Sequence, residues 1–201
     1  MHVVGSIIAR LGSKRLPYKN LLPFGGVPLL GLGIQKLRVS AVDEIIVSTE
    51  SELIARVARD FGARVLPRPP ELAADDVPSV PVFQHILQHC PCDIHVNFNI
   101  NFPLCEPGVI NRAIAVAAEM GEGLSEPVAV WAQTAQCLRS YGDPWTITAV
   151  RFQDARAGAI DVHREDDLLE CYRLAQGELA GWPAGRPDGA VLPGAAAQAA
   201  L

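Results

Sequence analysis

The chain has 201 residues, of which 49% are hydrophobic and 19% charged, and its formal net charge at pH 7 is -5. This composition is typical of one folded domain with its own core and excludes a largely disordered chain. The acidic balance argues against a general nucleic-acid-binding protein, which would carry a broad basic face, and no apolar run reaches the roughly 18 residues of a membrane-spanning helix.

Short runs typical of β-strands alternate along the chain with stretches of helical periodicity. In chain order we predict a strand at 2–9, a helix at 29–41, a strand at 43–49, a helix at 50–63, a strand at 64–67, a helix at 78–90, a strand at 93–100, a helix at 106–121, strands at 128–133 and 146–152, and a helix at 164–179. This alternation predicts an α/β fold of three layers, Rossmann-like, with a mostly parallel sheet between helices. Ligands of such sheets bind at the carboxyl ends of the strands.

From about residue 177 onward, glycine, alanine and proline dominate the sequence, and no hydrophobic periodicity is present. Such a stretch has too little apolar patterning to build a core of its own. We therefore predict a folded domain over residues 1–176 and a mobile or loosely packed tail over residues 177–201.

Directly after the first predicted strand, a short loop gathers positive charge against the acidic average of the chain. It contains Gly12 and Ser13 among four basic residues: Arg10, Lys14, Arg15 and Lys19. The backbone N–H groups of a glycine-containing loop, together with lysine and arginine side chains, suit a polyphosphate. The loop has neither a Walker A motif nor the glycine spacing of a dinucleotide fingerprint. From the spacing alone, a solvated basic loop explains the cluster equally well.

Four longer blocks follow one another in the sequence. They are "IIARLGSKRLPYKNLLPFGGVPLLG", "DEIIVSTESELIARVARDFGARVLPRPPELAADDVPS", "VNFNINFPLCEPGVINRAI" and "IDVHREDDLLECYRLA". Together they resemble the sugar-acid cytidylyltransferases, the family that includes acylneuraminate and 3-deoxy-manno-octulosonate (Kdo) cytidylyltransferases. The second block is similar to the acylneuraminate branch, and the third is more similar to the Kdo branch. The resemblance covers roughly residues 3 to 175 and implies a nucleotidyltransferase fold and an enzyme that couples CTP to a sugar acid and releases pyrophosphate.

Carried over position by position, the resemblance implies roles for individual residues. It implies triphosphate binding by Arg10, Ser13, Lys14 and Lys19, nucleoside binding by Asn20, Arg68 and Ser79, acceptor binding by Asn99 and Asn101, and metal binding by Asp161 and His163. When a hydroxyl attacks the α-phosphorus, negative charge grows on the phosphoryl oxygens and on the departing pyrophosphate, so fixed cations lower the barrier. Arg10, Lys14 and Lys19 are therefore the expected catalytic residues.

Two positions depart from the family pattern at the metal site. The resemblance implies Mg²⁺, held by two aspartates, but Asn101 and His163 stand where those aspartates are expected. Mg²⁺ prefers carboxylate and phosphate oxygens, whereas a histidine suits softer ions such as Mn²⁺. Asp161 lies two residues before His163, so in a strand the two side chains would share a face. We expect Mg²⁺, with Mn²⁺ as an alternative, and weaker metal binding than in the family.

The residues expected to bind the acceptor also depart from the family pattern. Asn99 and Cys105 stand where the acylneuraminate branch has a glutamine and an arginine, and little chain is left for the family's dimerisation arm. The acidic acceptor and a homodimer therefore both stay open. The alternative function is a catalytically degenerate protein of the same fold that binds CTP or another nucleotide and serves as a partner or regulatory subunit.

Cysteine and histidine residues allow two further interpretations. The five cysteines are odd in number and unevenly spaced, and the N-terminus does not resemble a secretory signal. Both features indicate a reducing cytoplasm. His85 and His89 could share one helix face and bind zinc, but no second ligand pair follows at a suitable distance, which favours an ordinary helix-to-strand connection.

Overall fold

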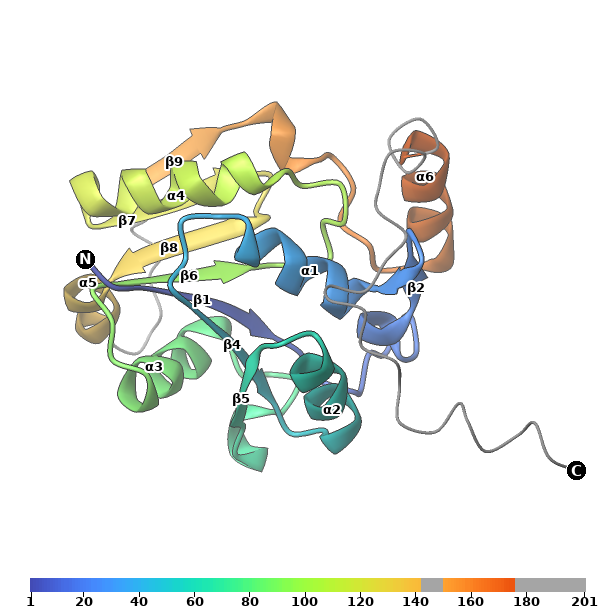
Figure 1. Cartoon of the computed structure of the whole chain (residues 1–201), viewed down its shortest axis with the longest axis horizontal. Coiled ribbons are helices and arrows are strands. Elements are labelled where there is room, and N and C mark those ends of the chain that lie inside the picture. Colours follow the sequence, from blue (N-terminus) through green and yellow to red (C-terminus); the bar gives the residue numbers. More distant parts are fainter. Residues whose placement is uncertain (142–149, 176–201) are drawn as a thin grey trace, which may run out of the picture.

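The computed structural model describes residues 1–141 and 150–175 of the chain. Within these residues, seven strands form one sheet in the order β5-β4-β1-β6-β8-β7-β9, and helices cover both of its faces (Figure 1). The strands of this sheet are β1 (Val3–Ile8), β4 (Glu44–Thr49), β5 (Arg64–Pro67), β6 (Ile94–Phe98), β7 (Glu122–Glu126), β8 (Val130–Thr134) and β9 (Val150–Gln153). A separate short hairpin consists of β2 (Pro23–Phe24) and β3 (Val27–Pro28).

The helices are α1 (Leu29–Arg38), α2 (Glu52–Asp60), α3 (Ser79–His89), α4 (Pro107–Met120), α5 (Ala135–Ser140) and α6 (Glu165–Ala175), with short 3-10 turns η1 (Lys19–Leu21), η2 (Pro70–Leu72) and η3 (Ala155–Ala157). Local sequence explains several helix ends. The Ser51 side chain accepts a hydrogen bond from the Ile54 N–H and begins α2. Gly62 and Gly121, both with positive φ, follow α2 and α4, because glycine adopts this conformation without steric cost.

The pairing confirms a mostly parallel sheet. β1 pairs in parallel with β4 and β6, β4 with β5, and β7 with β9, whereas β8 runs antiparallel to both β6 and β7. The parallel strands β1, β4 and β6 therefore end at the same edge of the sheet. In Figure 1 the arrowheads of β1 and β6 point toward the side on which β2 and α6 lie.

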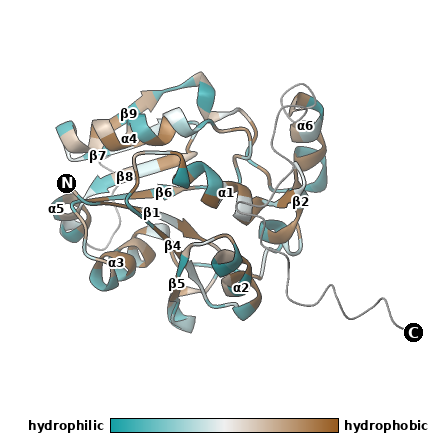
Figure 2. Cartoon of the chain, viewed as in Figure 1, coloured by the Kyte–Doolittle hydropathy of each residue, from teal (hydrophilic) through white to brown (hydrophobic). Residues whose placement is uncertain are grey.

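The core lies on both faces of the sheet. On one face, α1, α2 and α4 bury residues such as Ile34, Ile54 and Ile110 against β1 and β6. On the other face, α3 buries Val82 and Ile86 against β1 and β4. The helices carry hydrophobic and hydrophilic residues on different sides in Figure 2, as expected for helices that cover a sheet. Alternate residues of each central strand thus belong to different layers, and this alternation decides which side chains reach the site.

Most predicted elements are present with shifted ends, and the differences have local causes. β7 was not predicted, because its sequence EGLSE lacks the apolar alternation of a strand although four of its five residues are buried. The β2-β3 hairpin and the six-residue helix α5 were not predicted either, because both are too short to show periodicity. Of the strand predicted at 146–152, residues 150–152 belong to β9, and residues 146–149 lie outside the described part, as does the predicted tail at 177–201.

Two observations concern the protein's relation to membranes and the redox state of its cysteines. Among the helices of residues 1–141 and 150–175, none combines the length and the apolar character needed to cross a membrane. The five cysteines, all within the described residues, are free thiols: Cys90, Cys92, Cys105, Cys137 and Cys171. Free thiols agree with the prediction of a reducing compartment but do not test it directly.

Candidate functional site

Two adjoining cavities lie at the carboxyl edge of β1 and β6. The first, which we call the cationic cavity, has a volume of about 300 Å³, and seven predicted site residues line it: Arg10, Ser13, Lys14, Lys19, Asn20, Asn101 and His163. The second, the neutral cavity, has a volume of about 280 Å³ and includes the predicted residues Ser79, Asn99 and Asn101. Because Ile8 and Asn101 line both cavities, the two are neighbours. The structure thus gathers most of the predicted site at one edge of the sheet.

The loop after β1 is held in place by hydrogen bonds from three directions. The Asn20 side chain donates from Nδ2 to the carbonyl of Arg10 at 2.8 Å. Glu50, just after β4, accepts the Leu11 N–H at 2.9 Å. Lys19 donates from Nζ to the carbonyl of Val162 at 2.9 Å. The basic side chains therefore project from a braced loop, and preorganised charges of this kind favour binding and catalysis.

The loop after β6 has its own brace. Lys36 of α1 is buried, and its ammonium group donates to the carbonyls of Pro103 and Cys105 at 2.5 Å each. The Asn99 side chain accepts the N–H of Asn101 at 3.1 Å through Oδ1. These contacts fix the segment that carries Asn99 and Asn101 at the edges of the two cavities.

Asp75 is a member of the site that the sequence analysis did not single out. Its carboxylate pairs with both Arg10 and Lys14. Hydrogen bonding to Lys14, with further attraction from Arg10 and Lys14, holds the pKa of the Asp75 carboxyl below its usual value. Asp75 lies between Arg68 and Ser79, two residues that were expected to bind the nucleoside. In the structure its carboxylate forms ion pairs with the two exposed cations of the loop.

Replacing Asp75 by asparagine is expected to tighten the binding of a polyphosphate. If Arg10 and Lys14 bind a triphosphate, as the sequence predicts, the triphosphate has to displace the Asp75 carboxylate, and Asp75→Asn removes that competition. Exposed ion pairs are weak, so we expect a gain of about three- to tenfold in CTP affinity. Calorimetric titration checks this, with Asp76→Asn as the control, because Asp76 is exposed and the charge change is the same. An equal gain in CTP affinity for both variants would mean that only the net charge of the protein affects binding.

Lys19 differs from the other cations because its side chain is buried. The residue is 8% exposed, and its removal from water lowers the pKa of the ammonium group to about 8, although the Asp161 carboxylate opposes the shift. The nearby Arg15 and Arg10 lower the pKa further. A buried ammonium group without a full counter-charge binds an incoming phosphate strongly, because the phosphate restores the lost interaction.

The two predicted metal ligands lie side by side but are already engaged. His163 contacts Asp161 through Nε2 at 3.0 Å and Arg15 through Nδ1 at 2.9 Å. A guanidinium group can only donate, so Nδ1 of His163 accepts and its proton lies on Nε2, facing Asp161. Asp167 accepts the N–H groups of His163 and Arg164 at 2.8 Å each and so fixes the start of α6.

This arrangement limits the side-chain atoms that could coordinate a metal ion. Among the described residues, no group of three or more His, Cys, Asp and Glu side chains is placed to hold a metal ion. Both ring nitrogens of His163 have partners, and Asp161 supplies the carboxylate. The donors present therefore fit a hard ion that takes most of its ligands from substrate phosphates and water, which is how Mg²⁺ is commonly bound.

Of the predicted nucleoside residues, Arg68 lines neither cavity. It is buried, and its guanidinium donates to the Ser48 carbonyl at 2.6 Å and to the Ser48 hydroxyl at 3.2 Å. Burial lowers the pKa of Arg68 to about 10. The residue thus anchors the segment after β5 to the end of β4. Ser79, by contrast, lines the neutral cavity from the first turn of α3.

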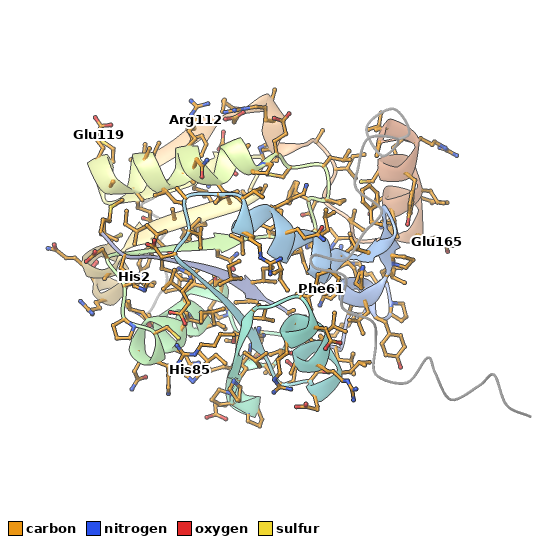
Figure 3. All side chains as sticks on the ribbon, viewed as in Figure 1. His2, Phe61, His85, Arg112, Glu119 and Glu165 are labelled. Atoms are coloured by element: carbon orange, nitrogen blue, oxygen red, sulfur yellow. The ribbon has the colours of Figure 1, made fainter. Side chains whose placement is uncertain are left out.

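The histidines considered for zinc binding lie away from these cavities. The rings of His85 and His89 lie with centroids 4.4 Å apart and planes tilted by 47°, and Nδ1 of His89 contacts the carbonyl of His85 at 2.9 Å. Figure 3 shows His85 on α3, away from the end of the molecule that carries Glu165 of α6. Within the described residues, no third ligand completes a metal site there.

Comparisons with known proteins agree with the resemblance in the sequence. The N-acylneuraminate cytidylyltransferase B of Danio rerio is 35% identical over 121 residues, which are 60% of this chain and 29% of that protein. The 3-deoxy-manno-octulosonate cytidylyltransferase of Geobacter sulfurreducens is 33% identical over 122 residues, 59% of this chain and 46% of that protein. The chain thus matches less than half the length of either enzyme.

A solved structure shares the fold. CMP:2-keto-3-deoxy-manno-octonic acid synthetase, determined in complex with CTP, superposes with a TM-score of 0.74 at 15% identity and covers 89% of this chain and 100% of that one. This likeness confirms the Rossmann-like nucleotidyltransferase architecture. The model of the cytidylyltransferase family matches residues 4–150, which include β1 with its basic loop and both strands beside it. The chain therefore belongs to the cytidylyltransferase family.

Proposed function

We propose that this protein is a cytidylyltransferase that couples CTP to a sugar acid or a related acidic acceptor, giving a CMP-linked product and pyrophosphate. The observation that carries the proposal is the cationic cavity, because the family's opening block supplies Arg10, Lys14, Arg15 and Lys19 to one hollow at the edge of the sheet. The relatives named above act on N-acylneuraminate and on Kdo. The proposal assigns the same class of acceptor, a sugar acid, to this chain.

In the proposed reaction, a hydroxyl oxygen of the acceptor attacks the α-phosphorus of CTP, and pyrophosphate leaves. The protein's main task is to hold the triphosphate and to neutralise charge as it moves onto the leaving group. Arg10 and Lys14 bind the terminal phosphates after Asp75 is displaced, and Lys19 contributes a charge shielded from water. Ser13 adds a hydroxyl in the same loop, while its backbone N–H donates to the Leu11 carbonyl at 3.0 Å.

We assign Mg²⁺ to Asp161 in this proposal, with Mn²⁺ as the alternative. When bound, the ion would neutralise phosphate charge, and triphosphate oxygens would complete its ligand set. Asp161 does not itself line the cationic cavity, but its carboxylate contacts His163, which does. Of this chain's residues, Asp161 would hold the ion, while Arg15 and Asp167 keep His163 in position.

The second candidate is a nucleotide-binding protein of the same fold without turnover. The engagement of His163 by Asp161 and Arg15 favours it, because a metal-assisted enzyme gains from free carboxylates at these positions. Such a protein would bind CTP with little dependence on divalent ions. Its role would be that of a partner or regulatory subunit.

Pyrophosphate release separates the two candidates. The assay supplies CTP, Mg²⁺ or Mn²⁺, and in turn N-acetylneuraminate, Kdo and N,N'-diacetyllegionaminate. We expect release with at least one acid, dependent on the metal ion and lost in Asp161→Ala. Calorimetry of CTP binding runs in parallel. CTP binding without release under any condition would support the second candidate, and no CTP binding by a folded protein would contradict both.

The lowered pKa of Lys19 predicts a pH dependence of CTP binding. The free protein loses the Lys19 proton as pH rises through about 8, whereas bound phosphates stabilise the ammonium form and raise its pKa. Binding should therefore take up a proton above pH 8, and metal-free CTP affinity should fall by up to about tenfold per pH unit there. Calorimetry in buffers of different ionisation enthalpy measures the uptake. Lys19→Arg, which keeps its charge, should show neither the uptake nor the fall.

A further inference from the structure

Asp75 reaches the basic loop from a distant part of the chain and pairs with its outer cations. It lies in the connection between η2 and α3, and its carboxylate forms ion pairs with Arg10 and Lys14. The side chains of Asp75 and Lys14 are 41% and 74% exposed, and ion pairs that are this open to water are weak. The carboxylate can therefore leave the two cations and return to them at little cost.

The turn that carries Asp75 is fastened on both sides. Before it, the buried guanidinium group of Arg68 donates to β4, and Leu72 packs against the core beneath α3. After it, Val77 packs against the same core, whereas residues 74–76 are exposed. A carboxylate on a short tip with fixed ends stays close to the loop after a ligand displaces it. Its effective concentration there therefore stays high.

A tethered carboxylate competes with every phosphate that needs the same cations. In the proposed reaction Arg10 and Lys14 bind the terminal phosphates of CTP, and these two phosphates leave together as pyrophosphate. The competition weakens the binding of CTP and of pyrophosphate by the same factor, because either ligand first has to displace the carboxylate. The loss matters little for CTP at concentrations above its dissociation constant. For the product it is a gain, since slow product release often limits turnover.

CTP and pyrophosphate differ in what else holds them in the site. CTP keeps its nucleoside and its α-phosphate, whereas pyrophosphate is severed from both when the bond breaks. Within the described residues Asp75 does not pair with the buried Lys19, whose ammonium group donates to the carbonyl of Val162. The returning carboxylate thus takes back two cations from pyrophosphate and leaves it with Lys19. Replacing its contacts one by one gives pyrophosphate a stepwise way out.

We propose that Asp75 displaces pyrophosphate from the cationic cavity after each turnover by returning to Arg10 and Lys14. This inference rests on the proposed function, since pyrophosphate arises in the transfer of CMP to the acceptor. No covalent bond forms or breaks in the step, because one anion replaces another on the same two cations. Asp75 acts through these cations and is a release residue, not a catalytic one.

The first test measures the binding of CTP and of inorganic pyrophosphate by calorimetry. For Asp75→Asn we expect both ligands to bind about three- to tenfold more tightly than to the wild type, by the same factor. Asp75→Glu keeps the carboxylate and should restore the wild-type affinities. The matched control is Asp76→Asn, an exposed neighbour with the same change of charge, which should leave both affinities nearly unchanged. An unchanged pyrophosphate affinity in Asp75→Asn would overturn the inference.

The second test separates product release from the chemical step. With enzyme in excess over CTP, Asp75→Asn should form the CMP-linked product in a single turnover as fast as the wild type does. In the steady state, kcat and the KM for CTP should both fall about three- to tenfold, because pyrophosphate release then limits turnover. Added pyrophosphate should also inhibit the variant at a lower concentration. A slower single turnover would place Asp75 in the chemical step and contradict its role in release.

Failure of the inference and failure of the proposed function give different results. If the wild type turns over and Asp75→Asn matches it in kcat and in its sensitivity to added pyrophosphate, only the inference is overturned. If the wild type forms no CMP-linked product with any sugar acid, the proposed function is refuted, and the role of Asp75 in release is refuted with it.

Discussion

Lys19→Met is expected to lower the rate of pyrophosphate release about a hundredfold or more and, at pH 7, to make the folded protein more stable. The loss of rate follows from the position of the ammonium group, which is shielded from water in the cationic cavity. Removing one preorganised donor from a site that stabilises developing charge typically costs about 10²- to 10³-fold. Methionine keeps an unbranched side chain, one heavy atom shorter than that of lysine, and removes its charge and its hydrogen bond.

The gain in stability follows from the cost of burying that charge. The pKa of Lys19 is about 8 in the folded protein and 10.5 without the fold. Below pH 8 the ammonium form is present in both states, and the folded state bears the full burial cost. Methionine removes this cost but leaves the carbonyl of Val162 without its donor, so we expect a net gain of about 1–2 kcal/mol.

The pH dependence has a definite sign. Because the folded pKa is depressed below the unfolded one, wild-type stability should rise as pH increases from about 8 to about 10.5. The advantage of Lys19→Met should therefore be largest below pH 8 and disappear above that window. Urea unfolding of both proteins at pH 7 and at about pH 10 measures the difference, provided that both remain folded and two-state.

Lys14→Met is the matched control for this experiment. The Lys14 side chain is 74% exposed and pairs with Asp75 at the surface. Its replacement should weaken CTP binding but change the free energy of unfolding little, because exposed ion pairs contribute little. Equal stability changes in the two variants would contradict the assignment of a burial cost to Lys19.

The comparison of sequence with structure shows what local pattern can predict. The strand-loop-helix alternation predicted the layers, because periodicity reports which residues are buried. The charge pattern predicted the basic loop, since one contiguous block carries those residues, and the resemblance implied their roles. β7 was missed because its buried Glu122 finds partners, the indole of Trp131 and the hydroxyl of Tyr141, that only the fold brings near.

The candidate site, like the fold, could be predicted from the sequence only in part. The cations of the loop after β1 lie within a few residues of one another, so the sequence predicted their cluster. The partners that decide their behaviour come from elsewhere: Asp75 lies 65 residues from Arg10, and Val162 lies 143 residues from Lys19. No sequence signal pointed to the contacts of the Ser6 hydroxyl with His95 and Asn97, because Ser6 lies on β1 and the other two lie on β6, about 90 residues later.

His163→Asp is expected to increase Mg²⁺-supported pyrophosphate release. The change restores an aspartate where the family pattern has one, and it places a second carboxylate two residues from Asp161. It also releases Arg15 from Nδ1 of His163, so the guanidinium becomes available to the triphosphate. A second hard oxygen ligand should lower the Mg²⁺ concentration for half-maximal activity about tenfold or more and reduce any preference for Mn²⁺.

The same variant tests the two candidate functions against each other. If the wild type turns over slowly for want of a ligand, His163→Asp should raise the rate, and Asp161→Ala should abolish it in either background. If the wild type only binds nucleotide, the variant should acquire metal-dependent CTP binding first, measurable by titrating Mg²⁺ in the presence of CTP. An unchanged response to Mg²⁺ would mean that residue 163 does not border the metal. The assignment of the ion to Asp161 would then fail with it.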